Sequence, residues 1–253
     1  MFRYAVIGSG SCGNSYIFET DSSCFVVDQG YSFSEFSRRA RSMGFDVNKI
    51  KYVFVTHNHR DHTCGVEVMS NALRIPVFAS REDDFSEVVK KGMFCRVDVN
   101  CGETYTLDDF SFTVFKTFHD DPASVGYSFR YGDLRFTIIT DTGKTSPEME
   151  RLSSDSDIIF LESNYCPHML MNGPYPYYLK KRIMSECGHL SNFDALEFLN
   201  KLDSGRRRAV YLCHISAKNN SPDRVREVFD GKIGPQFDCH ICRRGIPVPG
   251  IEF

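Results

Sequence analysis

The feature that most constrains this chain is a run of three histidines and one aspartate within residues 57–62, His57-Asn58-His59-Arg60-Asp61-His62. An apolar run over 52–55 precedes it and is typical of a buried strand. The residues over 66–73 that follow it are typical of a helix. The four candidate ligands therefore lie on the turn where a strand leads into a helix.

This turn has the composition of a metal site. Imidazole and carboxylate groups are ligands that zinc, manganese and iron accept in proteins. His57 and His59 are two residues apart in an extended turn, so their side chains project to the same side. Asp61 and His62 come where the chain begins to curl into the helix, so they are expected to point elsewhere. Two pairs of side chains that point to two different places predict two metal positions. The alternative is a histidine-rich surface loop, which is disfavoured because so many ligand-type residues directly follow a buried strand.

Length and composition narrow the class of protein. The 253 residues contain no evident linker, repeat or low-complexity segment, which predicts a single domain over 1–253. The net charge of -3 excludes a general attraction to nucleic acid or membrane, so such binding would need a local patch. The chain has ten scattered cysteines, no signal-like start and no bilayer-length apolar run, so we expect a reduced, cytoplasmic protein without membrane contact.

The hydrophobic pattern predicts more strands than helices. Helical spacing predicts helices over 33–43, 66–73 and 178–186, a charged helix-like segment over 81–91, and helices that begin at Ser191 and at Ser221-Pro222; residues 166–176 are expected to form a loop. Strands are expected over 2–7, 15–19, 24–28, 52–55, 75–79, 95–99, 104–107, 110–118, 125–130, 134–140, 157–162, 208–213 and 236–243, the last at an edge. Because many of them are joined by hairpin-like turns, two sheets packed face to face with helices outside fit better than a doubly wound parallel sheet.

Further ligand-type residues follow predicted strands. His119 comes after 110–118, Asp141 after 134–140 and His214 after 208–213. Asp28 closes the strand over 24–28 and is expected to reach the site from behind. These positions predict a site built from strand-end loops at one rim of the sheets. The glycine-rich loop over 8–14 lacks the lysine and the helix of a phosphate-binding P-loop, which leaves a hairpin turn or a wall of the active site.

The run over 57–62 matches the HxHxDH signature of the metallo-β-lactamase fold superfamily, and His119, Asp141 and His214 resemble its later motifs in the right order. The chain is most similar to the YycJ (WalJ/VicX) subgroup of cytosolic bacterial proteins in its segments 8–15, 141–143, 162–164, 188–192 and 214–220. The resemblance implies an α+β fold, an αββα four-layer sandwich of two mixed sheets with helices outside.

The resemblance also implies a binuclear site of two divalent metal ions, zinc, manganese or iron. By position, the first metal would be held by His57, His59 and His119, the second by Asp61, His62 and His214, and Asp141 would bridge both. One shared anion offsets the repulsion of two cations about 3.5–4 Å apart, and the pair activates a water as nucleophile. Asp61 is accordingly expected among the catalytic residues as well.

His189 competes with His214 for the place of last ligand, since both lie in similar sequence contexts. His214 follows a buried strand, whereas His189 precedes a helix, whose N-terminal amides attract anions. We therefore assign His189 to the substrate phosphate, as hydrogen-bond donor or general acid, with a purely structural histidine as the alternative. Ser191 and Asn192 are expected to contact substrate beside it. The cationic run Lys180-Lys181-Arg182 is either a solvated face or a track for a phosphate backbone.

These residues favour a metal-dependent phosphodiesterase. The resemblance implies nucleic acid as substrate, DNA rather than RNA, with cleavage from an end and no obligate protein partner. A hydrolase of a small ester or small phosphodiester, such as a thioesterase, lactonase or cyclic-nucleotide phosphodiesterase, is the alternative. A metal-binding regulatory protein is a third possibility, and the complete ligand set argues against it.

Overall fold

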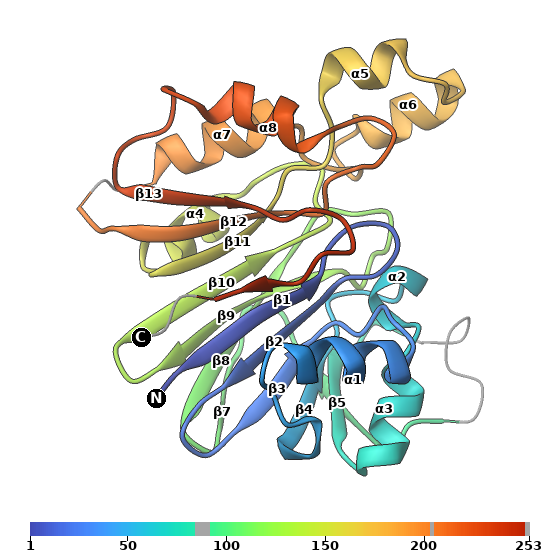
Figure 1. Ribbon diagram of the computed structural model, residues 1–253, viewed down its shortest axis with the longest axis vertical. Helices are drawn as coiled ribbons and strands as arrows, with labels where there is room; N and C mark the ends of the chain where they lie inside the picture. Colours follow the sequence, from blue (N-terminus) through green and yellow to red (C-terminus); the bar gives the residue numbers. More distant parts are fainter. Residues whose placement is uncertain (84–91, 203–204, 251–253) are drawn as a thin grey trace.

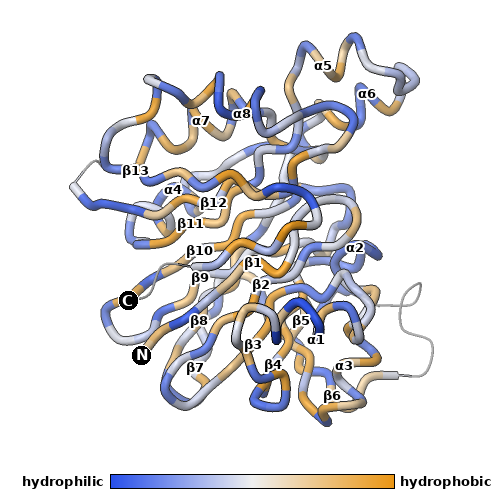
Figure 2. The backbone as a smooth tube through the Cα atoms, viewed as in Figure 1, coloured by the Kyte–Doolittle hydropathy of each residue, from blue (hydrophilic) through white to orange (hydrophobic). Residues whose placement is uncertain are grey.

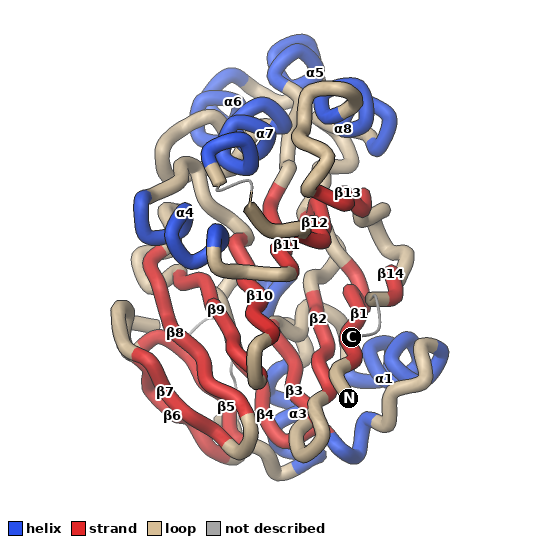
Figure 3. Tube along the Cα trace, turned by 90° about the vertical axis from the view of Figure 1, so that its left-hand side faces the viewer, coloured by secondary structure: helices blue, strands red, loops and turns tan. Residues whose placement is uncertain are grey.

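The computed structural model describes residues 1–83, 92–202 and 205–250. These residues form two seven-stranded mixed sheets, with helices on the outer faces (Figures 1 and 3). The predicted αββα sandwich is thereby confirmed. The charged helix expected over 81–91 falls mostly outside the described residues.

The first sheet is built from the N-terminal part of the chain and one late strand. Its order is β14 (Val248–Pro249), β1 (Arg3–Gly8), β2 (Ser15–Glu19), β3 (Cys24–Val27), β4 (Ile50–Phe54), β5 (Pro76–Ser80) and β6 (Cys95–Val99). Strands β14 to β3 pair antiparallel, and β3 to β6 pair parallel. The parallel strands end at one rim of the sheet. Residues 57–62, which contain the candidate metal ligands, follow β4 at this rim.

The second sheet has the same mixed character. Its order is β13 (Phe237–Ile241), β12 (Arg208–Cys213), β11 (Ile158–Glu162), β10 (Leu134–Ile139), β9 (Val125–Tyr131), β8 (Phe110–Lys116) and β7 (Thr104–Leu107). The first four are parallel to one another, and the rest pair antiparallel. The edge strand expected over 236–243 is confirmed as β13. Because β10, β11 and β12 are parallel, the residues that follow them meet at one end of the sheet.

The helices cover the outer faces. The first sheet carries α1 (Phe33–Ser42) and α3 (Val66–Leu73), with the 3-10 helix Val47–Lys49 and the short α2 (Arg60–Thr63). The second sheet carries α4 (Pro147–Ser154), α7 (Asn192–Lys201) and α8 (Pro222–Phe229). Two further short helices, α5 (Pro167–Asn172) and α6 (Tyr177–Ile183), project from one end of the sandwich (Figure 1).

Helix α5 corrects one sequence prediction. We expected residues 166–176 to be a loop because they are rich in proline and glycine, yet Pro167–Asn172 is helical. Pro167 lies in the first turn, where backbone N–H groups have no partner within the helix. A proline there loses no hydrogen bond, and its fixed φ angle suits the helix. The prolines and Gly173 therefore bound a short helix instead of preventing one.

Three apolar layers hold the sandwich together. Alternation along β2 sends Tyr16 and Phe18 into the layer between the sheets and Ile17 into the layer beneath the helices. Phe18 stacks on Phe136 of the opposite sheet, with ring centroids 4.6 Å apart. Hydrophobic colour accordingly follows the strands in Figure 2. Truncation of such a buried ring to alanine costs about 3–5 kcal/mol.

Candidate metal centre

Three strand-end residues of the site have left-handed backbone. Asp28 follows β3 at φ 56°, Asp141 follows β10 at φ 51° and His214 follows β12 at φ 53°. Such angles are uncommon for residues other than glycine, and aspartate and histidine are among those that tolerate them. Each of these residues turns the chain sharply at the end of a strand, and all three side chains lie in the cluster between the two sheets.

His57, His59 and His119 form the first group of candidate ligands, with one ligand atom from each lying within 4.8 Å of the others. Nδ1 of His119 lies 3.0 Å from the carbonyl oxygen of Gly188. That hydrogen bond leaves Nε2 of His119 directed at the group, 3.3 Å from Nδ1 of His59. Burial lowers the pKa of His119 to about 4, so its imidazole is neutral near pH 7.

His57 supplies the sharpest test of whether the residues fit a metal. Its Nδ1 lies 3.0 Å from the hydroxyl of Thr56, whereas its buried Nε2 has no hydrogen-bond partner among the described residues. Burial lowers the pKa of His57 well below 6.5, so the ring is neutral and carries a free lone pair. A buried nitrogen without a partner is unfavourable unless something binds it, and a metal ion suits it.

Asp61, His62 and His214 form the second group. Nδ1 of His62 lies 2.7 Å from Oδ2 of Asp28, which orients the ring from behind. Nε2 of His214 lies 3.5 Å from Oδ2 of Asp61. Burial opposes the charged form of His62, but the carboxylates of Asp28, Asp141 and Asp61 raise its pKa well above 6.5. This group therefore holds protons that a divalent cation would displace.

Asp141 lies between the two groups. Its Oδ2 is 3.1 Å from Nε2 of His62, and its Oδ1 is 3.8 Å from Nε2 of His119. Burial would raise the pKa of Asp141, but His214 and His62 hold it well below the usual 3.8. An ionised carboxylate within reach of both groups has the position that a bridging ligand requires.

Glu162 is the member of the site that the sequence reasoning missed. It ends β11, is fully buried, and its Oε1 lies 2.7 Å from Nδ1 of His189 and 2.9 Å from Nδ1 of His214. The pattern that identified Asp141 and His214, an acid or histidine at the end of a buried strand, also applied to Glu162. Burial would raise its pKa, but His189 and His214 lower it, which keeps the carboxylate ionised.

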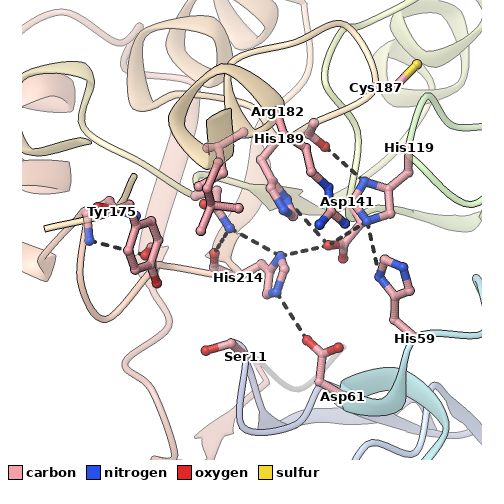
Figure 4. Close-up of a pocket in the computed structure, with 16 residues that line it drawn as sticks. Ser11, His59, Asp61, His119, Asp141, Tyr175, Arg182, Cys187, His189 and His214 are labelled. Carbon is pink, nitrogen blue, oxygen red and sulfur yellow. Dashed lines mark hydrogen bonds and ion pairs between the residues drawn. The ribbon is translucent and has the colours of Figure 1, made fainter. Parts of the chain in front are cut away.

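Five of the candidate ligands line an open pocket of about 250 Å³, namely His59, Asp61, His119, Asp141 and His214 (Figure 4). His57 and His62 are buried and do not line it. His189 lines it and exposes 20% of its side chain, whereas His214 exposes 6%. Ser11, in the glycine-rich loop, also lines the pocket. That loop joins the antiparallel strands β1 and β2, so both alternatives for it hold: it is a hairpin connection and a wall of the site.

The expected substrate contacts divide into two sets. Arg182 lines the pocket and forms an ion pair with Asp120, whereas Lys180 and Lys181 do not line it. Ser191 and Asn192 are buried, do not line the pocket and bond to other residues of the protein, so their expected contact with substrate stays a prediction that this geometry does not favour. Ser191 caps α7 by accepting from the amide of Asp194, and Asn192 bonds Ser163 and Asn220.

The comparisons with known proteins agree with this geometry. A model described as the Beta-lactamase superfamily domain matches residues 24–215. The chain belongs to the metallo-β-lactamase superfamily. Its similarity to the solved metallo-β-lactamase fold protein YhfI from Bacillus subtilis has a TM-score of 0.75 at 17% identity, covering 98% of this chain and 99% of that one.

Two curated relatives are similar to this chain over most of its length. It is 31% identical over 225 residues to exodeoxyribonuclease WalJ of Streptococcus pneumoniae serotype 2 (strain D39 / NCTC 7466), covering 87% of this chain and 83% of the relative. It is 28% identical over 251 residues to exodeoxyribonuclease YycJ of Bacillus anthracis, covering 94% of each. The fold and the His/Asp clusters together point to a hydrolase that uses divalent metal. Among the described residues, none of the helices is long and apolar enough to span a membrane.

Proposed function

We propose that the protein is a metal-dependent phosphodiesterase that removes nucleotides from an end of DNA. The observation that carries the proposal is the set of overlapping candidate ligand groups around Asp141, at an open pocket that Asp141 itself lines. The substrate is suggested by the exodeoxyribonuclease names of relatives that cover most of the chain. A cytoplasmic location and the absence of an obligate protein partner are part of the proposal, and ten free cysteines agree with a reducing compartment.

The proposed ligand assignment follows the two groups. His57, His59 and His119 would hold one ion, Asp61, His62 and His214 a second, with Asp141 shared. Zinc, manganese and iron all suit such nitrogen and oxygen donors. When bound, two divalent ions supply positive charge for the transferring phosphorus and activate a water for in-line attack. Asp61, at the edge of the pocket, would orient that water.

His189 is proposed as the group that meets the phosphate. Its Nδ1 lies 2.7 Å from Oε1 of Glu162, so the Nδ1–H group donates a hydrogen bond to the carboxylate. Nε2 is then the nitrogen available to the pocket. In its protonated form it would donate to a phosphate oxygen and pass a proton to the leaving 3′ or 5′ oxygen. The ionised Glu162 stabilises that imidazolium, as a carboxylate does for a catalytic histidine.

Arg182 is proposed as the first positive charge that a phosphate backbone meets. Its guanidinium lies in the pocket wall and is paired with Asp120, whose Oδ1 is 3.1 Å from Nε2 of His119. A substrate phosphate would compete with Asp120 for the guanidinium, which binds two oxygens at once.

End-labelled DNA tests the proposal directly. Protein loaded with zinc, manganese or iron is expected to shorten the labelled strand one nucleotide at a time, and matched RNA should be cut more slowly. A small diester, a thioester and a lactone run in parallel cover the alternative function, because a pocket of about 250 Å³ also admits such molecules. Hydrolysis of those small substrates with intact DNA would overturn the nuclease and favour the small-ester hydrolase.

A further inference from the structure

The segment with α5 and α6 forms an arm over the pocket, and its chemistry is unlike that of the other helices. All of α6 is at least partly exposed, although most of its side chains are apolar or aromatic. Tyr177 and Tyr178 expose 63% and 75% of their surface. Exposed aromatic side chains mark a binding surface only where they gather beside a site, so the face of α6 on which each tyrosine lies decides whether it can serve the pocket.

Helical spacing separates the two tyrosines. Leu179, Arg182 and Ile183 all line the pocket and share one face of α6, since they are three and four residues apart. Tyr178 lies four residues before Arg182, so it adjoins that face at its outer edge. Tyr177 lies on the opposite side, where Nζ of Lys181 sits 4.9 Å from its ring centroid.

A third tyrosine, Tyr175, precedes α6 and lies in the pocket itself. Tyr175 lines the cavity and lies on the far side of His214 from His59 and His119 (Figure 4). It stands directly before Pro176, which disfavours helical backbone at Tyr175. The backbone of Tyr175 is therefore restricted before any substrate binds, which lowers the entropy lost on contact.

The net positive charge of this arm favours a polyanion as its binding partner. Between Cys166 and Leu190 the charged side chains apart from histidine are Lys180, Lys181, Arg182 and Glu186, a net charge of +2 in a chain of net charge -3. Aromatic rings followed directly by a run of cations, beside a pocket proposed to cleave phosphodiesters, match a strand whose phosphates meet the cations while its bases stack on the rings.

We infer that Tyr175 and Tyr178 form a stacking track on either side of Arg182 for unpaired bases next to the cleaved phosphate. The inference rests on the proposed function and specifies its substrate as a single strand, either free or frayed from a duplex end.

The test compares Tyr178→Ala with Tyr177→Ala, a matched control on the same helix that points away from the pocket. Stacking contributes enough per base that the Tyr178→Ala change should lower kcat/KM on a single strand, relative to a small diester, by about 5–100-fold. Tyr178→Phe should restore most of the loss, because the ring and not the hydroxyl does the stacking. Tyr177→Ala should match wild type, and Tyr175→Ala should behave like Tyr178→Ala.

An abasic substrate gives the decisive second measurement. Removing the base that faces Tyr178 should weaken binding of a cleavage-resistant phosphorothioate strand to wild type, but not to Tyr178→Ala, because the missing contact is the same. Equal losses in Tyr177→Ala and Tyr178→Ala, or additive losses from the abasic site and Tyr178→Ala, would overturn the track. Parallel DNA and RNA strands identify which sugar the arm accepts.

These outcomes separate the inference from the function. If wild type degrades DNA but all four variants degrade it equally well, the nuclease stands and the track is wrong; the exposed tyrosines would then fit a protein contact. If wild type cleaves only the small diester, both the nuclease and the track are overturned.

Discussion

Oδ2 of Asp28 lies 2.7 Å from Nδ1 of His62, at the fully buried rear of the candidate metal centre. The same carboxylate accepts hydrogen bonds from the amide and the hydroxyl of Thr56, at 2.8 Å each. Asp28 therefore fixes the orientation of the His62 ring, with its Nε2 toward the site. It also holds Thr56, where the turn that carries the candidate ligands begins.

The first prediction concerns this carboxylate. Asp28→Asn should weaken metal binding by about 10–100-fold, the usual effect of removing such a supporting group, while the fold persists. Asparagine tolerates the left-handed φ angle of 56° at this position. Titration against a metal-binding dye measures the affinity. Asp108→Asn is the matched control, since Asp108 also has a left-handed φ, of 47°, but belongs to an exposed turn between β7 and β8.

The second prediction concerns the unpartnered nitrogen of His57. In wild type, added zinc should raise the midpoint of thermal unfolding, because metal binding and folding are linked. His57→Ala should lose most of that increase and part of its bound metal. His168→Ala, an exposed histidine of α5, should retain the full response. Unchanged metal content in His57→Ala would remove this residue from the ligand set.

The third prediction separates His189 from His214. His189→Ala should keep both metals and lose about 10²–10⁴-fold in turnover of phosphodiesters, which is typical of a lost general acid. His214→Ala should lose metal, because its ring is buried among Asp61, Asp141 and Glu162. Elemental analysis with single-turnover kinetics distinguishes the two. Metal loss in His189→Ala with full occupancy in His214→Ala would reverse the assignment.

The fourth prediction concerns salt. The pocket position of Arg182 implies that Arg182→Gln weakens DNA binding and flattens its dependence on log salt by roughly one unit. Lys181→Gln should have a smaller effect, because Lys181 lies beside Tyr177 on the other side of α6. Binding isotherms at several salt concentrations measure both slopes. Equal slopes for the two variants would mean that the whole cationic run contacts the backbone.

The fifth prediction concerns the metal-free protein as pH rises. The carboxylates around His62 and His214 raise both folded pKa values well above 6.5, so this contribution to stability is full below 6.5. It is lost as pH rises through the folded pKa values, when the rings no longer neutralise Asp28, Asp61, Asp141 and Glu162. Chelated protein should therefore unfold at lower denaturant concentration at about pH 9 than at about pH 6, and zinc should reduce the difference. A flat profile in chelator would contradict it.

Much of the site could be predicted because its residues follow a local rule. A ligand-type side chain at the end of an apolar strand identified His57, Asp141 and His214. Parallel pairing in the second sheet brings Asp141 and His214 together, and the packing of the two sheets brings His57 to them. Glu162 is the last residue of the apolar strand β11, so the same rule predicts it as a member of the site. The capping signature at Ser191 was likewise visible, with Asp194 three residues on, and already accounts for the Ser191 hydroxyl.

Other features could not be derived from local pattern. The amide of Asn192 bonds Ser163 and Asn220, which are 29 and 28 residues away in sequence, so its burial depends on tertiary packing. The same holds for α6: its periodicity predicted a helix, but only the structure shows that Arg182 faces the pocket and Lys181 does not. Which face of a short, exposed helix meets a site is decided by its neighbours.

The two sheets each supply only half of the metal centre. Asp28, His57, His59, Asp61 and His62 follow strands of the first sheet, and His119, Asp141, Glu162 and His214 follow strands of the second. The ligands can meet only when the aromatic layer between the sheets is closed, as in the stacking of Phe18 on Phe136. Metal bound by both halves would therefore join the two sheets, and its affinity would depend on how well the layer between them is packed. A cavity made in that layer, far from the pocket, should then show first as a faster loss of metal.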